Sequence, residues 1–418
     1  MENTQVQVSS EIGDLEAVIL HTPGQEVENM TPKNAERALY SDILNLSVAQ
    51  KEYSQFKGVI NKQAKVFELR DLLTEILTND VIKNQLIDEI FQFELVTESR
   101  DYLLSLSNTE LTRQLIEGVV MKKDNLTRFF DIDRFSLRPL HNLFFMRDAS
   151  MAINQKVLIG KMASPVRERE TRIMEAIFNH HPAFITKTIN PARFDNYNAK
   201  ITIEGGDVLV ARHDILIIGT GVRTSSQGID FILEQFKTRG NIKHIIVQEL
   251  PDSPESFIHL DMVFTFLDVN KCMVFEPVIL QPNKYRTVHI NLEGEKVKIS
   301  TVSNLLTVLK KLGIDLEPVF CGGQGDPWTQ EREQWHSGAN FFALGPGKVI
   351  GYERNVYTME EMNKHGFEII RARDVLKKTI QLADYKKYVV TIDGSELARG
   401  GGGARCMSMP VRRKPVEW

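Results

Sequence analysis

The sequence predicts an α/β fold that is built from repeated strand-and-helix units and carries an all-helical segment. Short β-branched runs that end at a turn residue or a charge recur along the chain, at a spacing on the order of 60 residues. These runs are 15–20, 156–160, 214–219, 272–275 and 348–351. Helical patterns such as Arg167–Phe178 and Ile229–Phe236 lie between them. Any large α/β protein would show a similar alternation, so these patterns leave the number of units open.

One region departs from this alternation. From about Val66 to Met121, apolar residues recur at helical spacing. The residues that share a helix face are Leu69, Leu72, Leu73, Ile76 and Leu77, followed by Ile82, Leu86, Ile87 and Ile90. Ser107–Glu110 has the sequence of a capping box. We therefore expect a helical insertion whose leucine stripes pack internally instead of forming a groove for a partner.

Composition and charge exclude several classes of protein. The chain has 418 residues, a net charge of −4 and well-mixed signs, which gives no support for a nucleic-acid partner or an anionic membrane. The N-terminus is polar and no apolar run approaches the length of a membrane span. Three cysteines argue against a disulfide framework, and no zinc-binding spacing is present. The sequence predicts a soluble cytoplasmic enzyme.

A glycine-rich stretch, "ARGGGGARCMSMP", ends at a candidate nucleophile, Cys406. Four glycines let the backbone approach a ligand closely or let a loop move. Arg405 and Arg399 would provide a positive field that favours the thiolate. The alternative, a flexible linker followed by a small buried cysteine, has equal weight at this point.

A cysteine nucleophile needs a partner for proton transfer, and His259 is the best candidate. In "FIHLDMVF", His259 and Asp261 are two residues apart, so on a strand they would point to the same face. Glu204 ends an expected apolar strand, 201–204, just before two glycines, and Asp148 ends an expected aromatic-rich strand, "NLFFMRD". The alternatives are outward-facing polar residues of a strand for the first pair and turn caps for the two carboxylates.

Taken together, these segments resemble one enzyme family. The ordered set "NLFFMRDA", "VRERET", "IEGGDV", "GVRTS", "FIHLDMVFT" and "ARCMSMP" is similar to the arginine deiminase family of guanidine-modifying enzymes. The resemblance covers essentially the whole chain, from "SEIGDLEAVILHTPG" to the end. It implies a pentein-type fold, a five-bladed pseudo-symmetric α/β propeller formed by 1–65 and 131–418, with 66–130 as the helical insertion.

The resemblance also implies an activity and the residues that perform it. L-Arginine and water would give L-citrulline and ammonia through a covalent S-alkylthiouronium intermediate, without metal or organic cofactor. Each implied role falls on a residue of the matching motifs: Cys406 as nucleophile, His259 as general acid and base, Glu204 holding His259, Asp148 and Asp261 gripping the guanidinium, Arg167 and Arg223 holding the substrate carboxylate, Asn142 and Phe145 lining the pocket, and Arg399 with the glycines forming a lid.

Other activities stay open at this point. An amidinotransferase uses a similar Cys/His site but passes the amidino group to an amine. Agmatine or methylated arginines are alternative substrates, although paired arginines argue against agmatine, which lacks a carboxylate. A catalytically silent arginine-binding protein is an alternative of another class. The only partner that we expect is the small-molecule substrate, with a homo-oligomer, dimer or higher, left open.

Overall fold

The computed structural model describes residues 3–32, 40, 42–94, 96, 99–194, 199–237, 241–294 and 296–418. Within these ranges, five sheets of three or more strands share one pairing rule. In each sheet, a middle strand pairs antiparallel with a first strand and parallel with an outer strand. In the order first, middle and outer, the strands are β22 (Met409–Arg413), β2 (Leu15–Leu20) and β3 (Lys65–Glu68); β6 (Ser150–Ile153), β7 (Lys156–Ile159) and β9 (Lys187–Ile189); β10 (Val208–Arg212), β11 (Ile215–Thr220) and β12 (His244–Glu249); β13 (Phe264–Asp268), β14 (Lys271–Val274) and β17 (Glu317–Phe320); β18 (Phe342–Gly345), β19 (Lys348–Tyr352) and β21 (Tyr388–Ile392).

In each unit a helix connects the middle strand to the outer one, because a parallel pair needs a crossover connection. These helices are α3 (Leu46–Ile60), α9 (Glu168–His180), α10 (Ser226–Lys237), α12 (Leu305–Lys311) and α14 (Val356–Lys364). Further elements extend or connect the units: β15 (Thr287–Glu293), β16 (Lys296–Val302), β20 (Glu368–Arg371), β1 (Thr4–Gln5), β8 (Phe184–Ile185), β4 (Val119–Val120), β5 (Phe135–Leu137), α1 (Gln25–Glu28), α11 (Glu276–Ile279), α13 (Pro327–Trp335) and α15 (Ala372–Leu376).

The middle strands are the β-branched runs that the sequence analysis selected. All five predicted runs overlap β2, β7, β11, β14 and β19, and the two named helical patterns lie in α9 and α10. The strands are almost wholly buried. Apolar residues on both faces of a strand fit a sheet that is covered on both sides. The prediction of repeated strand-and-helix units is confirmed for these elements.

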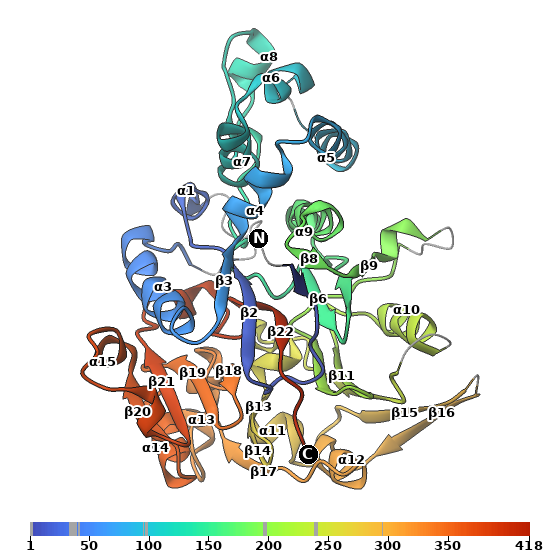
Figure 1. Ribbon diagram of the computed structural model, residues 1–418, viewed down its shortest axis with the longest axis vertical. Helices are drawn as coiled ribbons and strands as arrows, with labels where there is room; N and C mark the ends of the chain where they lie inside the picture. Colours follow the sequence, from blue (N-terminus) through green and yellow to red (C-terminus); the bar gives the residue numbers. More distant parts are fainter. Residues whose placement is uncertain are drawn as a thin grey trace.

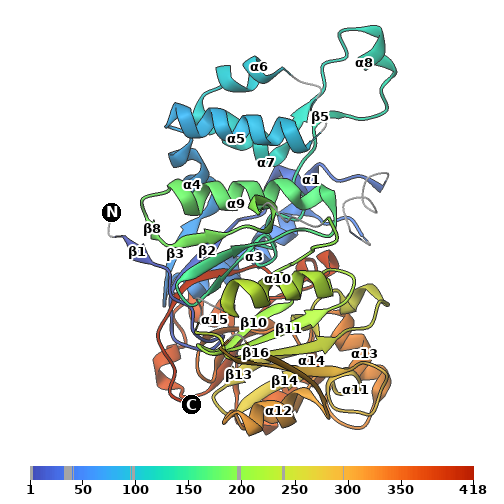
Figure 2. The ribbon, with the colours of Figure 1, turned by 90° about the vertical axis from the view of Figure 1, so that its right-hand side faces the viewer.

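The predicted helical segment lies at one end of the molecule, at the top of Figures 1 and 2. Its helices are α4 (Leu69–Ile76), α5 (Asp80–Phe93), α6 (Arg100–Ser105), α7 (Asn108–Glu117) and α8 (Leu126–Phe130). Ser107 Oγ accepts a hydrogen bond from the Glu110 amide, as the capping box predicts. Residues 66–68 differ from the helical prediction, because they belong to β3 and pair with β2. The leucine stripe of α4 packs in one core with Ile19 and Ile173.

Three segments that the sequence analysis assigned to strands are turns instead. His259 and Asp261 lie at a 3-10 turn, Leu260–Met262, which is closed by a hydrogen bond from the Met262 amide to the His259 carbonyl. Residues 142–148 form consecutive turns, and 201–204 contribute only an isolated bridge at Ile203. Local backbone bonds replaced strand pairing in these segments, although their apolar residues are buried as expected.

Two further findings concern the chain as a whole. Within the described part of the chain, no helix is both long and apolar enough to cross a membrane. Cys272, Cys321 and Cys406 are all buried free thiols.

A buried carboxylate on α3 anchors the segment that leads into the glycine run. Glu52 is 3 % exposed and accepts hydrogen bonds from the backbone amides of Ser395, Glu396 and Leu397 at 2.8–3.1 Å, and from the Ser395 hydroxyl. A carboxylate that accepts several backbone N–H groups fixes them as a helix cap does. Glu52 therefore fixes where the glycine run begins.

We expect Glu52→Ala to lower the free energy of unfolding by roughly 3 kcal/mol, because the amides of Glu396 and Leu397 would lose their buried acceptor. Urea denaturation would measure this loss. Glu52→Gln, which keeps one acceptor oxygen, should lose less, and Lys51→Ala on the exposed face of the same helix should change little. An equal loss in the Gln and Ala variants would contradict the anchoring role.

Candidate active site

Five polar residues that lead into the first strands of the five sheets meet at one place. They are Asp148, Glu204, Asp261, Asn340 and Cys406, which precede β6, β10, β13, β18 and β22. All five are buried. The sequence analysis identified four of them and missed Asn340. Its signal was present, since Asn340 stands just before the apolar run Phe341–Leu344 as Asp148 stands before Ser150–Ile153.

Hydrogen bonds join these five segments into a closed ring. The Arg147 amide donates to the Cys406 carbonyl, and the Gly205 amide donates to the Asp148 carbonyl. The Asp261 amide donates to the Gly206 carbonyl, and Asn340 Nδ2 donates to the Asp261 carbonyl. Asn340 Oδ1 accepts from the Arg405 amide at 2.8 Å, which closes the ring. The side chains are thus fixed by backbone contacts that cross between sheets.

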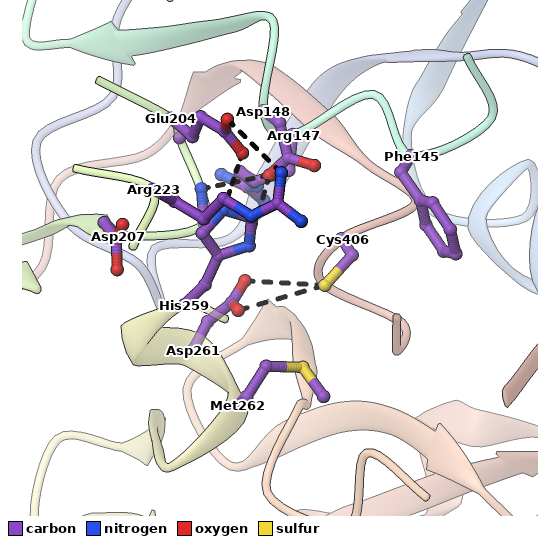
Figure 3. Close-up of polar contacts among 12 residues, drawn as sticks. Phe145, Arg147, Asp148, Glu204, Asp207, Arg223, His259, Asp261, Met262 and Cys406 are labelled. Atoms are coloured by element: carbon purple, nitrogen blue, oxygen red, sulfur yellow. Dashed lines mark hydrogen bonds and ion pairs between the residues drawn. The ribbon is translucent and has the colours of Figure 1, made fainter. Parts of the chain in front are cut away.

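The thiol of Cys406 faces two polar groups. Asn340 Nδ2 lies 3.2 Å from Sγ, and the two carboxylate oxygens of Asp261 lie 3.7 and 3.9 Å from it (Figure 3). Burial, with the nearby charges of Asp261 and Asp148, raises the pKa of the Cys406 thiol well above its ordinary value. Cys406 is therefore a neutral thiol at pH 7 in the free protein.

A histidine and a glutamate form the second pair of the site. His259 Nε2 lies 2.9 Å from Glu204 Oε2, and His259 Nδ1 lies 3.7 Å from Asp148 Oδ1. Burial alone would lower the pKa of His259, but Asp148 and Glu204 outweigh it and raise that pKa to about 9. Burial would likewise raise the pKa of Glu204, but His259 outweighs it and lowers that pKa to about 2. At neutral pH the pair is an imidazolium and a carboxylate.

The chain approaches this imidazole closely on one side. A Cβ atom at Gly206 would lie 2.4 Å from His259 Nδ1, so only glycine fits there. The Glu204 carboxylate is fixed independently, because Oε1 accepts a hydrogen bond from the Ala163 amide at 2.9 Å. The "EGGD" motif thus supplies both the carboxylate and the space for the histidine ring.

The Asp148 carboxylate is already paired with a guanidinium from the chain itself. Arg167 Nη1 lies 2.7 Å from Asp148 Oδ2, and Arg167 Nη2 lies 2.8 Å from Glu170 Oε2. Arg167 Nη2 also donates to the Phe145 carbonyl at 3.2 Å. In this state Arg167 contacts one of the two carboxylates that the sequence analysis assigned to the substrate.

The other predicted binding residues lie at different depths. Asn142 and Phe145 line the inner cavity, and Arg223 reaches within 4.0 Å of Glu204. Arg399 lies further out, where it is 38 % exposed and pairs with Asp42 and Glu396. The roles assigned to Asn142, Phe145, Arg167, Arg223 and Arg399 therefore stay predictions. Arg399 is the member of this set that does not line the inner cavity around the thiol.

Two connected cavities lead to the thiol. The inner one, of about 40 Å³, is lined by Cys406, His259, Asp148, Glu204 and Gly400–Gly402. An outer one, of about 480 Å³, shares Arg223, Ile258, Gly400 and Gly401 with it. A cavity needs about 10–15 Å³ to hold one water molecule, so the inner cavity has room for only a few waters and must widen before an amino acid can enter. Gly400 and Gly401 line both cavities and Gly402 lines the inner one, and we call these three residues the glycine wall.

One group of side chains has the composition of a metal site. Asp148, Glu204 and His259 each offer one ligand atom, and these atoms lie within 4.8 Å of one another. The same side chains are engaged in the contact to Arg167 and in the His259–Glu204 pair. This cluster therefore already balances its charges with the chain's own cationic groups.

Comparison with known proteins identifies the family. The arginine deiminase family model matches residues 36–413. The chain belongs to the arginine deiminase family. Relatives named arginine deiminase include that of Bacillus cytotoxicus, 35 % identical over 98 % of this chain and 99 % of its own, and that of Oenococcus oeni, 34 % identical over 100 % and 99 %. The family resemblance seen in the sequence is confirmed.

Solved structures share the fold of this family member. An amidinotransferase from Microseira wollei is 14 % identical and covers 99 % of this chain and 98 % of its own, with a TM-score of 0.53. DDAH from Pseudomonas aeruginosa in complex with citrulline is 13 % identical, with coverages of 95 % and 99 % and a TM-score of 0.51. The mixed α/β fold is thus the pentein fold of these solved structures.

We expect the His259 imidazole to titrate near pH 9, and Glu204→Gln to bring its midpoint down towards 6.5. The folded pKa of His259 is raised, so its contribution to stability is full below pH 6.5 and is lost as the pH rises through 9. NMR titration of the ring protons would measure the midpoint. His180, a histidine at the end of α9, serves as internal reference. An unchanged His259 midpoint in the variant would contradict the pairing.

We expect Gly402→Val to reduce kcat/KM about 100-fold while the protein stays folded. A Cβ atom at Gly402 would lie 2.4 Å from Phe145 Cε1, so the valine would push the cavity wall and the aromatic ring apart. Steady-state kinetics and circular dichroism would measure the two effects. Gly401→Ala, whose side chain meets open space but whose φ of +83° strains alanine, separates backbone strain from this collision. Unchanged kinetics in Gly402→Val would contradict the role of the glycine wall.

Proposed function

We propose that this protein hydrolyses L-arginine to L-citrulline and ammonia, with Cys406 as the nucleophile. The observation that carries the proposal is one buried thiol beside two carboxylates, Asp148 and Asp261, and an imidazolium held by Glu204. A guanidinium is a planar cation with N–H donors that paired carboxylates can accept and orient. The relatives named arginine deiminase support this assignment.

The first step is exchange of one guanidinium for another. Arg167 occupies Asp148 in the free protein, and the substrate guanidinium takes its place between Asp148 and Asp261. Arg167 Nη1 is then released toward the substrate carboxylate, which Arg223 approaches from the outer cavity. Forked guanidiniums suit a carboxylate, so these two arginines select a free amino acid over agmatine. Asn142 and Phe145 form the wall along the substrate's aliphatic chain.

Binding of the cation also activates the thiol. The carboxylates that raise the pKa of Cys406 are the same two that the substrate neutralises. Their compensation therefore lowers the pKa of Cys406 in the complex, and the Sγ proton passes to solvent as the substrate binds. The thiolate then attacks the guanidinium carbon perpendicular to its plane, and a C–S bond forms.

Proton transfer through His259 completes the reaction. The imidazolium gives its proton to the departing nitrogen, the C–N bond breaks and ammonia leaves. The S-alkylthiouronium remains on Cys406. His259, now neutral, takes a proton from water, and the resulting hydroxide adds to the same carbon. The C–S bond then breaks while the proton of the added hydroxyl passes to the departing sulfur, which gives citrulline and the neutral Cys406 thiol of the free enzyme. Glu204 keeps the imidazole oriented in both halves.

The finer organisation is part of the same proposal. Five sheets with one pairing rule and a ring of contacts between their leading turns support a five-bladed pseudo-symmetric propeller around Cys406. We assign 1–65 and 131–418 to this catalytic unit and 66–130 to a helical insertion. Three unpaired cysteines support a cytoplasmic location. Arg399 pairs with Asp42 beside the glycine wall, and in this proposal that ion pair holds the glycine lid closed over the site.

The main competing activity is transfer of the amidino group to an amine, since a structural relative is an amidinotransferase. Both reactions share the thiouronium intermediate, and they differ only in the molecule that attacks it. Formation of citrulline from arginine without an added amine separates them.

We expect the protein to form citrulline and ammonia from arginine alone, with agmatine turned over much more slowly. Cys406→Ala should lose activity by several orders of magnitude, because no other group can form the intermediate. Colorimetric citrulline assays and mass spectrometry of acid-quenched enzyme would measure turnover and the adduct on Cys406. Cys272→Ala, which removes a buried thiol of another sheet, is the matched control and should keep turnover. Full turnover in Cys406→Ala, or no citrulline from wild type, would overturn the proposal.

A further inference from the structure

The residue before the nucleophile, Arg405, points away from the thiol and into a buried network of charges. It is 1 % exposed. Its Nε and Nη2 atoms lie 2.9 and 3.2 Å from the two carboxylate oxygens of Glu11, and its Nη1 atom lies 2.8 Å from Asp261 Oδ2. Nη2 also donates to the Val208 carbonyl at 2.9 Å. A single guanidinium thus connects a carboxylate near the N-terminus to one beside the thiol.

In this network the Arg405 guanidinium lies between two carboxylates, those of Glu11 and Asp261. Burial would raise the pKa of Glu11, but Arg405 and Arg147 outweigh it and lower that pKa to about 2, so Glu11 is ionised. Glu11 and Asp261 both pair with Arg405, and Arg147 and Arg413 add positive charge around Glu11. Isolated buried charges are costly, and a bidentate pair with further hydrogen bonds compensates them. Arg405 therefore places a compensating positive charge against the Asp261 carboxylate in a dry site.

The geometry also fixes which oxygen of Asp261 is available. Oδ2 accepts from Arg405, while Oδ1 lies 3.9 Å from Cys406 Sγ. The carboxylate cannot rotate without breaking the 2.8 Å contact. Asp148 is held in a comparable way, since the Gly206 amide donates to its Oδ1 at 3.2 Å. Both carboxylates that flank the thiol thus have one acceptor fixed by the protein.

We propose that Arg405 and Glu11 are positioning residues, which together orient Asp261 toward the guanidinium and set the charge that Cys406 faces. This inference rests on the proposed function, since Asp261 is assigned there to the substrate. Arg405 fixes the carboxylate, and Glu11 cancels the arginine's charge so that Asp261 keeps its attraction for a cation. Loss of Arg405 would disturb the orientation of Asp261, whereas loss of Glu11 would disturb the charge that acts on the substrate and the thiol.

Kinetics of two substitutions test the positioning role. Arg405→Gln should raise the KM for arginine and lower kcat, together reducing kcat/KM about 100-fold, because Asp261 loses its fixed orientation. Arg405→Lys keeps the charge but not the fork, and should recover part of kcat. Glu11→Gln keeps an acceptor for Arg405. It should raise the KM for arginine severalfold with a smaller effect on kcat, because the negative charge of Glu11 no longer offsets the charge of Arg405.

A second measurement follows the Cys406 thiol in the free enzyme, without turnover. The charged groups that face this thiol are Asp261, Asp148 and Arg405, with the Tyr352 phenol nearby. Glu11→Gln removes a negative charge behind Arg405 and should lower the pKa of Cys406, whereas Arg405→Gln removes a positive charge and should raise it. A change of one in that pKa alters the thiolate fraction about tenfold at a fixed pH below it.

Iodoacetamide alkylation of Cys406, followed by peptide mass spectrometry from pH 7 to 10, would measure these opposite changes. Arg169→Gln is the matched control, because this buried arginine donates to the Leu115 carbonyl, pairs with Glu94 and makes no hydrogen bond to Asp261 or Glu11. It should leave the KM and the alkylation profile near those of wild type.

Alkylation changes in the same direction for Glu11→Gln and Arg405→Gln, or equal effects in Arg169→Gln, would overturn the inference. Thermal melting identifies any variant that fails to fold, and Arg405→Lys and Glu11→Gln then carry the test. Failure of wild type to form citrulline would instead overturn the proposed function, which the alkylation profiles do not depend on.

Discussion

The ring of hydrogen bonds between the five strand-leading turns is the constraint on which the rest of the site depends. Each bond crosses from one sheet to the next, from Cys406 through Asp148, Gly206 and Asp261 to Asn340. Five chain segments that are far apart in sequence are thereby held within one small volume. Because backbone groups make most of these bonds, the ring fixes the position of each side chain without using up its chemistry.

The ring gathers more charge than the interior of a protein ordinarily holds. Asp148, Glu204, Asp261 and Glu11 are paired with His259, Arg167 and Arg405, so that each of these seven side chains has a partner of opposite sign. Pairing makes their burial tolerable, and the low dielectric strengthens every interaction between them. In the proposed mechanism the thiol stays neutral until the substrate cation enters, so that substrate binding and activation of the nucleophile would be one electrostatic event.

Periodicity and residue type allowed much of the fold to be predicted from the sequence. The β-branched runs became the middle strands and the leucine stripes became helices, because these patterns depend on local burial. The backbone conformation next to the site was harder to predict. Residues 142–148 and 256–263 form turns where strands were expected. Their apolar residues are buried by neighbouring sheets, which a single segment cannot reveal.

Asn340 was missed, and the direction of the Arg405 side chain was not predicted, for the same reason. Asn340 carries no charge and no motif, and only its place before the fifth sheet marks it as an equivalent of Asp148. Arg405 was expected to provide a positive field for the adjacent thiol, and its charge does act to lower the pKa of Cys406. Nothing in the sequence indicated, however, that its side chain pairs with Glu11, almost four hundred residues earlier. Side-chain direction at a turn is decided by tertiary partners, and sequence neighbours give little information about it.

The small size of the inner cavity has a consequence for what can attack the intermediate. When ammonia departs, it vacates room for a molecule of its own size, and water is nearly its equal in volume and hydrogen bonding. The inner cavity measures only about 40 Å³ in the free protein, so a site that closes around the intermediate would leave little more than the space of the departed ammonia, too little for an alkylamine. The cavity would then act as a size filter on the second half of the reaction, in which one small molecule is exchanged for another. The choice between hydrolysis and transfer would depend on the volume of the cavity, since the catalytic groups could serve either reaction.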